Sequence, residues 1–219
     1  MTSNLSSLDT TQMGSLTATQ VASLSTTQIA GLVAADIGEM TTTQIQSLLT
    51  TQVANLTATQ LGALTTPNVT ALTETQVGAI TATQIKSLST TNLSGLDASQ
   101  AAALTTTQIA GLTTTQVGAL SATDIGELDA TQIGALSGTL LSRLTTQAVV
   151  ALDATHLGGL TSTQLQSFTT TQIAALGAGD VAEFTETQIA NLTATQVRAL
   201  TAPAARALAA TQVASLTTA

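Results

Sequence analysis

A large apolar residue recurs at every eighth position of this chain, and no insertion or deletion interrupts the period. Leucine fills most of these positions from Leu8 to Leu216. The exceptions are also large and apolar, namely Met40, Ile80, Phe168 and Phe184. Self-similarity at a fixed short period is typical of repeat proteins, in which each unit is stabilised by its neighbours. We therefore expect one repeat array, with a single domain over residues 1–219.

Each eight-residue unit carries a complete signal for the start of a helix. With the leucine as position one, the unit reads Leu, Thr, x, Thr, Gln, Ile or Val, small, small, as in residues 104–111. Thr at position two and Gln at position five have the spacing of a capping box, in which two side chains satisfy each other's backbone N–H groups. The apolar residues at positions one and six then form a hydrophobic staple. The repeat predicts an all-α solenoid of very short helices, about two turns each, one per unit.

A β-solenoid is the alternative architecture, because Thr, Val and Ile favour strands. However, the leucine and the Ile or Val lie five residues apart, on opposite faces of a regular strand. Position three, which would face inward beside the leucine, carries Glu74 and Glu186. Pro67 and Pro203 both occupy position four, the second residue of the expected helix, where proline is tolerated. These positions favour short helices over strands.

The capping residues are replaced in a minority of units. Asn68 and Asn92 stand in for glutamine with a shorter side chain. The least regular region runs from Ser137 to Leu160, where three successive glutamines are missing. Their replacements are Leu140, Ala148 and His156. Position two lacks a cap side chain at Val33, Leu49, Gly177 and Ala209. Clustering of the irregular units on one face would indicate a binding surface.

The charge of the chain excludes several classes of partner. The formal net charge is −8, and the basic residues are Lys86, Arg143, Arg198 and Arg206. Nucleic acids and anionic membranes attract basic surfaces, so we expect no nucleic-acid partner. No apolar run reaches the length that spans a bilayer, and the first residues show no signal peptide, so no membrane insertion is expected. The absence of cysteine removes disulfides and thiolate metal sites.

Acidic residues provide the only candidate metal ligands. The pattern Asp-[Ile/Val]-[Gly/Ala]-Glu occurs three times, first at Asp36 and Glu39. An Asp at position five can imitate the capping glutamine and interacts favourably with the helix dipole, so a structural role is expected. A weak Ca²⁺ site, which needs six to eight oxygen ligands, is the alternative. Its candidate ligands are Asp124, Glu127, Asp129, Asp180, Glu183 and Glu186.

No arrangement of residues points to catalysis. The single histidine, His156, occupies a glutamine position without a second His or Cys nearby, so we expect a helix cap or an exposed side chain. No phosphate loop, Ser/His/Asp set or dinucleotide fingerprint is present. Threonines at positions two and four could form a hydroxyl array for an ice or crystalline lattice, although capping accounts for position two. We predict no catalytic residues, no cofactor and no enzymatic activity.

The tandem L-T-x-T-Q-[IV]-x-x units resemble the octapeptide tracts of very large bacterial surface proteins, often labelled adhesion or haem-utilisation proteins. The resemblance covers essentially the whole chain, although no haem-ligand pattern accompanies it. A shorter likeness, to the opening L-T-x-x-Q-V of transcription-activator-like effector repeats, indicates only a shared helix-start device. Those repeats are much longer and carry base-reading residues that this chain lacks.

Together, the repeat and the resemblance imply a non-enzymatic rod or filament segment of a bacterial cell-surface or extracellular assembly. Both ends of the sequence stay in register without a recognisable polar capping unit, so we predict either that copies join head to tail or that this chain is one piece of a longer array. The alternative function is a binding module that presents a regular Thr-rich surface to a glycan, a peptide or an ice lattice.

Overall fold

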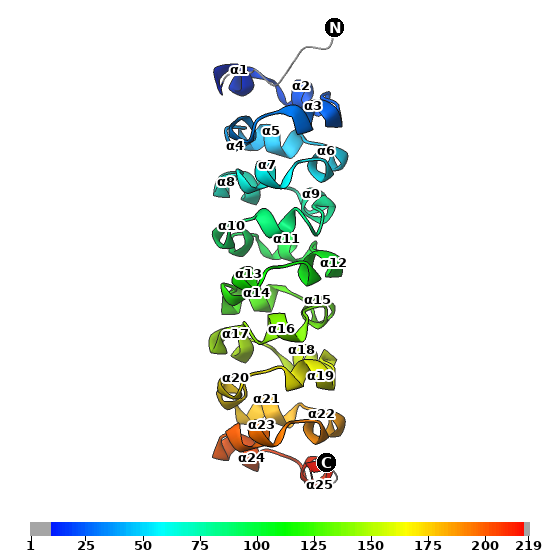
Figure 1. The fold of residues 1–219 in the computed structure, drawn as a ribbon, viewed down its shortest axis with the longest axis vertical. Coiled ribbons are helices and arrows are strands. Elements are labelled where there is room, and N and C mark those ends of the chain that lie inside the picture. Colours follow the sequence, from blue (N-terminus) through cyan, green and yellow to red (C-terminus); the bar gives the residue numbers. More distant parts are fainter. Residues whose placement is uncertain (1–9, 217–219) are drawn as a thin grey trace. The chain divides into compact units, whose positions relative to one another are not determined.

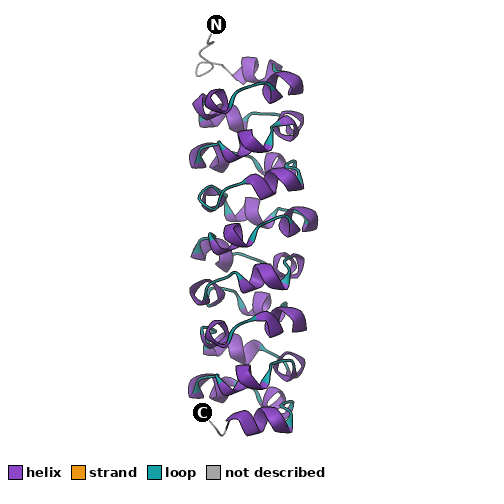
Figure 2. Cartoon of the chain, turned by 90° about the vertical axis from the view of Figure 1, so that its right-hand side faces the viewer, coloured by secondary structure: helices purple, strands orange, loops and turns teal. Residues whose placement is uncertain are grey.

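The fold is entirely helical throughout the part of the chain that the structure describes. This structure is a computed structural model, and it describes residues 10–216. In this range the regular elements are 25 α-helices and the 3₁₀ helix η2, and no strand is present (Figure 1, Figure 2). The prediction of an all-α solenoid with one short helix per repeat is therefore confirmed, and the β-solenoid alternative is wrong.

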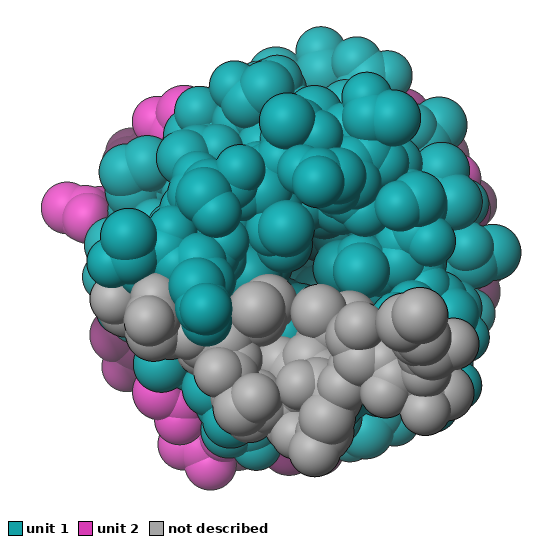
Figure 3. Space-filling view, turned by 90° about the horizontal axis from the view of Figure 1, so that it is seen from above, with its two compact units in different colours: residues 1–111 teal, residues 112–219 magenta. Residues whose placement is uncertain are grey.

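The chain divides into two compact units, residues 1–111 (unit 1) and residues 112–219 (unit 2), coloured separately in Figure 3. Within unit 1 the helices are α1 (Thr10–Ser15), α2 (Ala18–Ala22), α3 (Thr26–Gly31), α4 (Ala34–Gly38), α5 (Thr42–Ser47), α6 (Thr50–Ala54), α7 (Ala58–Gly62), α8 (Thr66–Thr70), α9 (Glu74–Ala79), η2 (Ile85–Ser87), α10 (Thr90–Ser94), α11 (Ala98–Ala102) and α12 (Thr106–Ala110). Within unit 2 they are α13 (Thr114–Gly118), α14 (Ala122–Glu127), α15 (Ala130–Gly134), α16 (Gly138–Leu141), α17 (Thr146–Val150), α18 (Ala154–Gly159), α19 (Ser162–Gln166), α20 (Thr170–Ala175), α21 (Ala178–Ala182), α22 (Glu186–Ala190), α23 (Ala194–Ala199), α24 (Ala202–Arg206) and α25 (Ala210–Leu216). The expectation of a single domain over residues 1–219 stays a prediction.

The helices are short because each repeat returns the backbone to an extended conformation. In α12 the N-cap residue Thr105 has φ −74° and ψ 155°, which is outside the helical region, and its side chain caps the helix. Eight residues later Thr113 adopts the same conformation and starts α13. Pro67 and Pro203 are the second residues of α8 and α24, as their sequence positions predict. The helix α12 ends at its C-cap Gly111, and the extended residue Thr113 then begins the next helix.

Within each unit, a helix packs against the helix three places along the chain. In unit 1, α2 packs against α5 and α4 against α7. In unit 2, α15 packs against α18 and α22 against α25. Three repeats therefore complete one turn of the solenoid, and successive turns stack directly on each other.

The core of each unit consists of the apolar residues at positions one and six. Every position-six residue from Met13 to Ile189 is buried, and the position-one residues from Leu32 to Leu192 are nearly as inaccessible. Small residues at positions seven and eight allow close stacking of the turns. A Cβ atom added at Gly38, for example, would lie 2.8 Å from the carbonyl oxygen of Ala63 in the next turn. The interior is therefore narrow and filled by aliphatic side chains.

No helix between residues 10 and 216 has the length and apolar character needed to cross a membrane. The helices contain at most seven residues, whereas a bilayer requires about 20.

Candidate functional site

The glutamine at position five caps its own helix, as the capping-box spacing predicts. In α7 the Gln60 side-chain oxygen Oε1 accepts the backbone N–H of Thr57 at 2.8 Å. The backbone N–H of Gln60 in turn donates to the Thr57 hydroxyl at 3.2 Å. Both partners of the box are therefore satisfied, and the extended residue at each corner is fixed.

The same glutamine also binds the preceding turn of the solenoid, which capping alone does not predict. The Gln60 amide nitrogen Nε2 donates to the carbonyl oxygens of Ile29 at 2.9 Å and Leu32 at 2.7 Å. The Gln60 side chain is buried, with 2% of its surface exposed. Its oxygen and its nitrogen therefore perform different tasks, one within a helix and one between turns.

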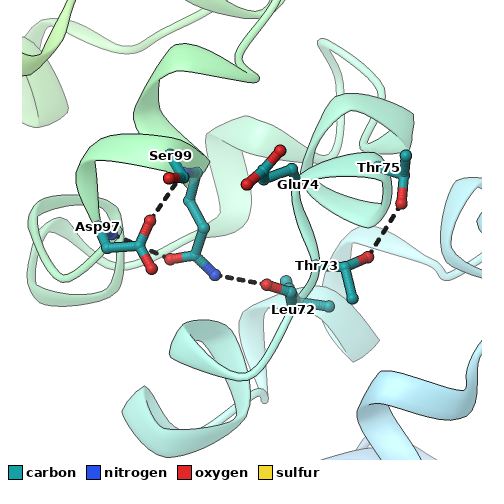
Figure 4. A pocket seen from close by; sticks show the side chains of 7 residues that line it. Leu72, Thr73, Glu74, Thr75, Asp97 and Ser99 are labelled. Carbon is teal, nitrogen blue, oxygen red and sulfur yellow. Dashed lines mark hydrogen bonds between the residues drawn. The ribbon is translucent and has the colours of Figure 1, made fainter.

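This arrangement recurs along both units, and we call it the glutamine ladder. Each member donates its amide to the carbonyl 28 residues earlier, and to one or both of those 30 and 31 residues earlier. In Figure 4 the hydrogen bond from Gln100 ends on the carbonyl of Leu72, at 2.6 Å. The members with such hydrogen bonds are Gln44, Gln52, Gln60, Gln76, Gln84, Gln100, Gln108, Gln164, Gln172, Gln188, Gln196 and Gln212.

Asparagine at position five keeps only the link between turns. The Asn68 amide nitrogen donates to Met40 at 3.0 Å, and that of Asn92 donates to Leu64 at 2.9 Å. Neither α8 nor α10 contains the capping box that glutamine completes. The side chain is one methylene shorter than glutamine, so it does not reach the neighbouring turn and its own N-cap together, and here it bonds to the neighbouring turn.

Aspartate at position five keeps only the cap of its own helix. Asp124 and Asp180 each accept the backbone N–H of the residue three before them, at 2.7 Å. An ionised carboxylate has no hydrogen to donate, so it cannot bind a carbonyl of the preceding turn. The predicted capping role of these aspartates is confirmed.

His156 reproduces both functions of glutamine with its two ring nitrogens. Nδ1 accepts the backbone N–H of Asp153 at 3.2 Å, and Nε2 lies 2.8 Å from the carbonyl oxygen of Leu128. Because a carbonyl oxygen only accepts, the contact with Leu128 places a hydrogen on Nε2. The predicted cap is confirmed, but the predicted exposed alternative is wrong, because His156 is only 5% exposed.

The N-cap residue Asp153 lies beside this histidine. It accepts the backbone N–H groups of His156 and Thr155, both at 2.9 Å. The backbone hydrogen bond from His156 and, to a smaller extent, that from Thr155 lower the pKa of the Asp153 carboxyl below its ordinary value of 3.8. Asp153 therefore stays ionised to a lower pH than an isolated aspartate does.

The irregular repeats do not gather on one face of unit 2. Leu140, Ala148 and His156 belong to α16, α17 and α18, which are consecutive and together complete one turn. These helices stack on α13, α14 and α15, respectively. The substitutions therefore surround one turn, and they do not mark the single face that a binding surface would need.

Most hydroxyl groups at position two are already engaged within the fold, although Thr65 makes no side-chain cap. Those of Thr57 and Thr113 accept the position-five backbone N–H at 3.2 Å. That of Thr113 also donates to the Gln116 oxygen at 3.0 Å. Capping at position two is confirmed. Where that residue is Val33, Leu49 or Gly177, the helix has no side-chain cap.

The acidic candidates for a calcium site occupy separate structural positions. Asp129 is the N-cap of α15 and accepts the Gln132 backbone N–H at 2.8 Å. Glu127 ends α14, Glu183 is the C-cap of α21, and Glu186 begins α22. Within residues 10–216, no three acidic or histidine side chains lie close enough together to hold a metal ion.

Two equivalent hollows lie between the N-terminal ends of stacked helices. One, between α9 and α11, is lined by Thr73, Glu74, Thr75, Asp97 and Ser99 (Figure 4). The other, between α22 and α25, has Glu186 in the position of Glu74. Both are open at the surface, and most of their lining side chains belong to positions two to four of the repeat. These features describe the regular outer surface of the solenoid.

Comparison with protein-family models finds no matching family, and comparison with curated proteins finds no matching sequence. The resemblance to octapeptide tracts of bacterial surface proteins therefore stays a prediction.

Proposed function

We propose that this protein is a non-enzymatic structural repeat protein, a rod or filament segment of a bacterial cell-surface or extracellular assembly. The glutamine ladder is the observation that supports it. In both units, position-five glutamines bond a turn to the preceding one, as Gln76 does to Leu48 in unit 1 and Gln188 to Leu160 in unit 2. Added repeats lengthen such a stack without any new type of contact.

The distribution of polar groups supports a structural role over a catalytic one. Buried polar side chains such as Gln52 and Gln172 are engaged in hydrogen bonds that hold adjacent turns together. Among the described residues, no buried side-chain nitrogen or oxygen is left without a hydrogen-bond partner. These hydrogen bonds explain why polar side chains are buried in the interior, without a catalytic role. The resemblance to octapeptide tracts supports the location on a bacterial surface.

Small-angle X-ray scattering of the monomer tests the rod. We expect the pair-distance distribution of an elongated, folded particle, with a helical circular dichroism spectrum. A compact, isotropic distribution would overturn the rod. Antibody labelling of intact and permeabilised cells that produce the protein tests the location, and labelling that requires permeabilisation would contradict a surface role.

A further inference from the structure

We propose that unit 2 opens reversibly at its irregular turn, the turn formed by α16, α17 and α18 (Figure 1). In this motion the irregular turn separates from α13, α14 and α15, on which its helices stack. The corner between α15 and α16 is the hinge. The inference goes beyond the proposed structural role, and it holds or fails independently of where the protein is located.

Among the described residues, a single side-chain hydrogen bond joins the irregular turn to the turn before it. This bond connects His156 Nε2 and the carbonyl oxygen of Leu128, at 2.8 Å. The other two position-five residues of the turn are Leu140 and Ala148, whose side chains have no hydrogen to donate. Because these two repeats are consecutive, the missing bonds leave adjacent helix pairs unlinked, and the pairs can separate together.

The turn that follows is joined more firmly, and its bonds define the hinge. Gln172, on α20, donates to the carbonyl oxygen of Leu144 at 2.8 Å. Gln164, on α19, donates to the carbonyl oxygens of Gly134 and Leu136, at 2.8 Å and 2.9 Å. Gly134 ends α15, and Leu136 precedes the N-cap of α16. The ladder therefore fixes this corner, whereas the helices beyond it lack such bonds to the preceding turn.

Two helix pairs at this interface also make no close contact at position seven. A Cβ atom added at Gly38 or Gly62 in unit 1 would lie 2.8 Å or 3.0 Å from a carbonyl oxygen of the next turn. At the equivalent Gly126 of α14 and Gly134 of α15, no such atom would lie within 4 Å. Gly158, one turn later, is equally free of contacts, but that interface has bonds of the glutamine ladder.

Apolar contact is what otherwise joins the two turns. Leu141, Val149 and Leu157 of the irregular turn are fully buried. Hydrophobic contact has no preferred direction, whereas each hydrogen bond of the ladder must break when two turns separate. Local opening follows the weakest set of contacts, so this interface opens at a lower free energy than one that the ladder joins.

Thiol labelling measures the opening, because the chain has no cysteine of its own. Val149→Cys places a thiol on α17. Val53→Cys is the matched control on α6, whose turn has three members of the glutamine ladder. Both valines are fully buried, so a thiol reagent reacts only when the site opens. We expect Val149→Cys to be labelled at least about 10-fold faster than Val53→Cys, because several hydrogen bonds are missing. Equal rates would overturn the inference.

Restoring the glutamine bonds should close the turn. In the Val149→Cys chain, Leu140→Gln/Ala148→Gln places amides opposite the carbonyls of Leu112 and Leu120, which accept no hydrogen bond from the described residues. We expect labelling to slow at least about 10-fold. The control Leu140→Met/Ala148→Met adds similar bulk without donors, and labelling should stay fast. If the control slows labelling as much as the glutamines do, packing and not hydrogen bonding governs the interface, and the inference fails.

A second site makes the test independent of one substitution. Val117→Cys places the thiol on α13, on the other side of the opening, and Val117 is also fully buried. Its labelling should be fast in the otherwise unmodified chain and slow once the two glutamines are introduced. Circular dichroism verifies the fold of each variant. Fast labelling of Val149→Cys with slow labelling of Val117→Cys would show that α17 frays alone, which contradicts a hinged opening between turns.

Discussion

Two turns of the solenoid differ sharply in how they bond to the turn before them. In unit 1, the turn formed by α5, α6 and α7 has Gln44, Gln52 and Gln60 at position five, and they donate to two, three and two carbonyls, respectively. In unit 2, the turn formed by α16, α17 and α18 has Leu140, Ala148 and His156 at the same positions. Of these three, only His156 contacts a carbonyl of the preceding turn.

The apolar core nevertheless continues through the irregular turn. Leu141, Val149 and Leu157 are fully buried, like their counterparts Ile45, Val53 and Leu61 in the regular turn. Leu140 and Ala148 at position five are also buried, so apolar contacts replace the hydrogen bonds that glutamine makes to the preceding turn. The comparison shows that aliphatic packing maintains the path of the chain, while the glutamines add directional bonds between turns.

The largest expected effect comes from removing the donor in the regular turn while retaining the cap. In Gln60→Glu, the carboxylate faces the carbonyl oxygens of Ile29 and Leu32 in a buried site. We expect a loss of about 4 kcal/mol of unfolding free energy at neutral pH, because one oxygen of the buried carboxylate faces carbonyl oxygens with no donor. Urea unfolding followed by circular dichroism measures this loss. Gln46→Glu, at an exposed residue of α5, should change stability by less than about 0.5 kcal/mol.

The same variant has a characteristic pH dependence. Burial next to carbonyl oxygens should raise the pKa of the introduced carboxyl above the unfolded value of about 4.3. The destabilisation should therefore be small below about pH 4 and grow as the pH rises from there, until it levels off above the folded pKa. If the loss of unfolding free energy did not depend on pH, it would come from altered packing and not from the introduced charge.

The second expected effect is a gain in stability, produced by a substitution in the irregular turn. The carbonyl of Leu120, which lies 28 residues before Ala148, accepts no hydrogen bond from the described residues. In Ala148→Gln, the new amide should reach this carbonyl and its oxygen should cap Thr145, which stabilises the protein by about 1–2 kcal/mol. The control Ala148→Met adds similar bulk without hydrogen bonds. Equal stability of the two variants, measured by urea unfolding, would argue against this mechanism.

A smaller gain in stability is expected in the third repeat of the irregular turn. His156 already supplies both a cap and one carbonyl contact, so His156→Gln adds only a second carbonyl bond. We expect less than about 1 kcal/mol of stabilisation. Hydrogen exchange of the α18 amides should slow modestly in this variant, and faster exchange would show that the imidazole packs better than the amide.

The smallest effect concerns the N-cap beside that histidine. Asp153→Asn keeps the hydrogen-bond acceptor and removes the charge. The wild-type pKa is lowered in the folded state, so the stabilising contribution of the charge is present above about pH 3.8 and is lost as the pH falls through the folded pKa. The difference should stay below about 0.5 kcal/mol, since Asp153 is 66% exposed and solvent screens it. Thermal unfolding of both proteins at pH 3 and pH 6 measures it, and a larger gap at pH 3 would contradict this sign.

The local structure was predictable because its determinants lie within one repeat. Thr105 and Gln108 are three residues apart, so their reciprocal caps follow from sequence spacing alone. The placement of Pro67 near the start of a helix follows from the same register. The candidate calcium ligands were grouped by sequence proximity, but between residues 10 and 216 no three acidic or histidine side chains lie close enough together to hold a metal ion.

The glutamine ladder was missed because a capping box accepts Glu as readily as Gln. The sequence does contain a signal for it, since no position-five residue in the 219-residue chain is Glu. A purely capping role would permit Glu, and the helix dipole would favour it. The absence of Glu favours a second role for the amide N–H beside capping, but it does not show which carbonyls the amide meets.

The sequence by itself determined that this chain forms short, capped helices with one apolar pair per repeat, because those interactions span at most eight residues. Only the tertiary structure decided that three repeats complete a turn, and that each glutamine bonds to carbonyls 28 to 31 residues earlier. The reason is physical: the angle at each corner results from the packing of whole turns, and a small change in that angle would bring different carbonyls within reach of the same side chain.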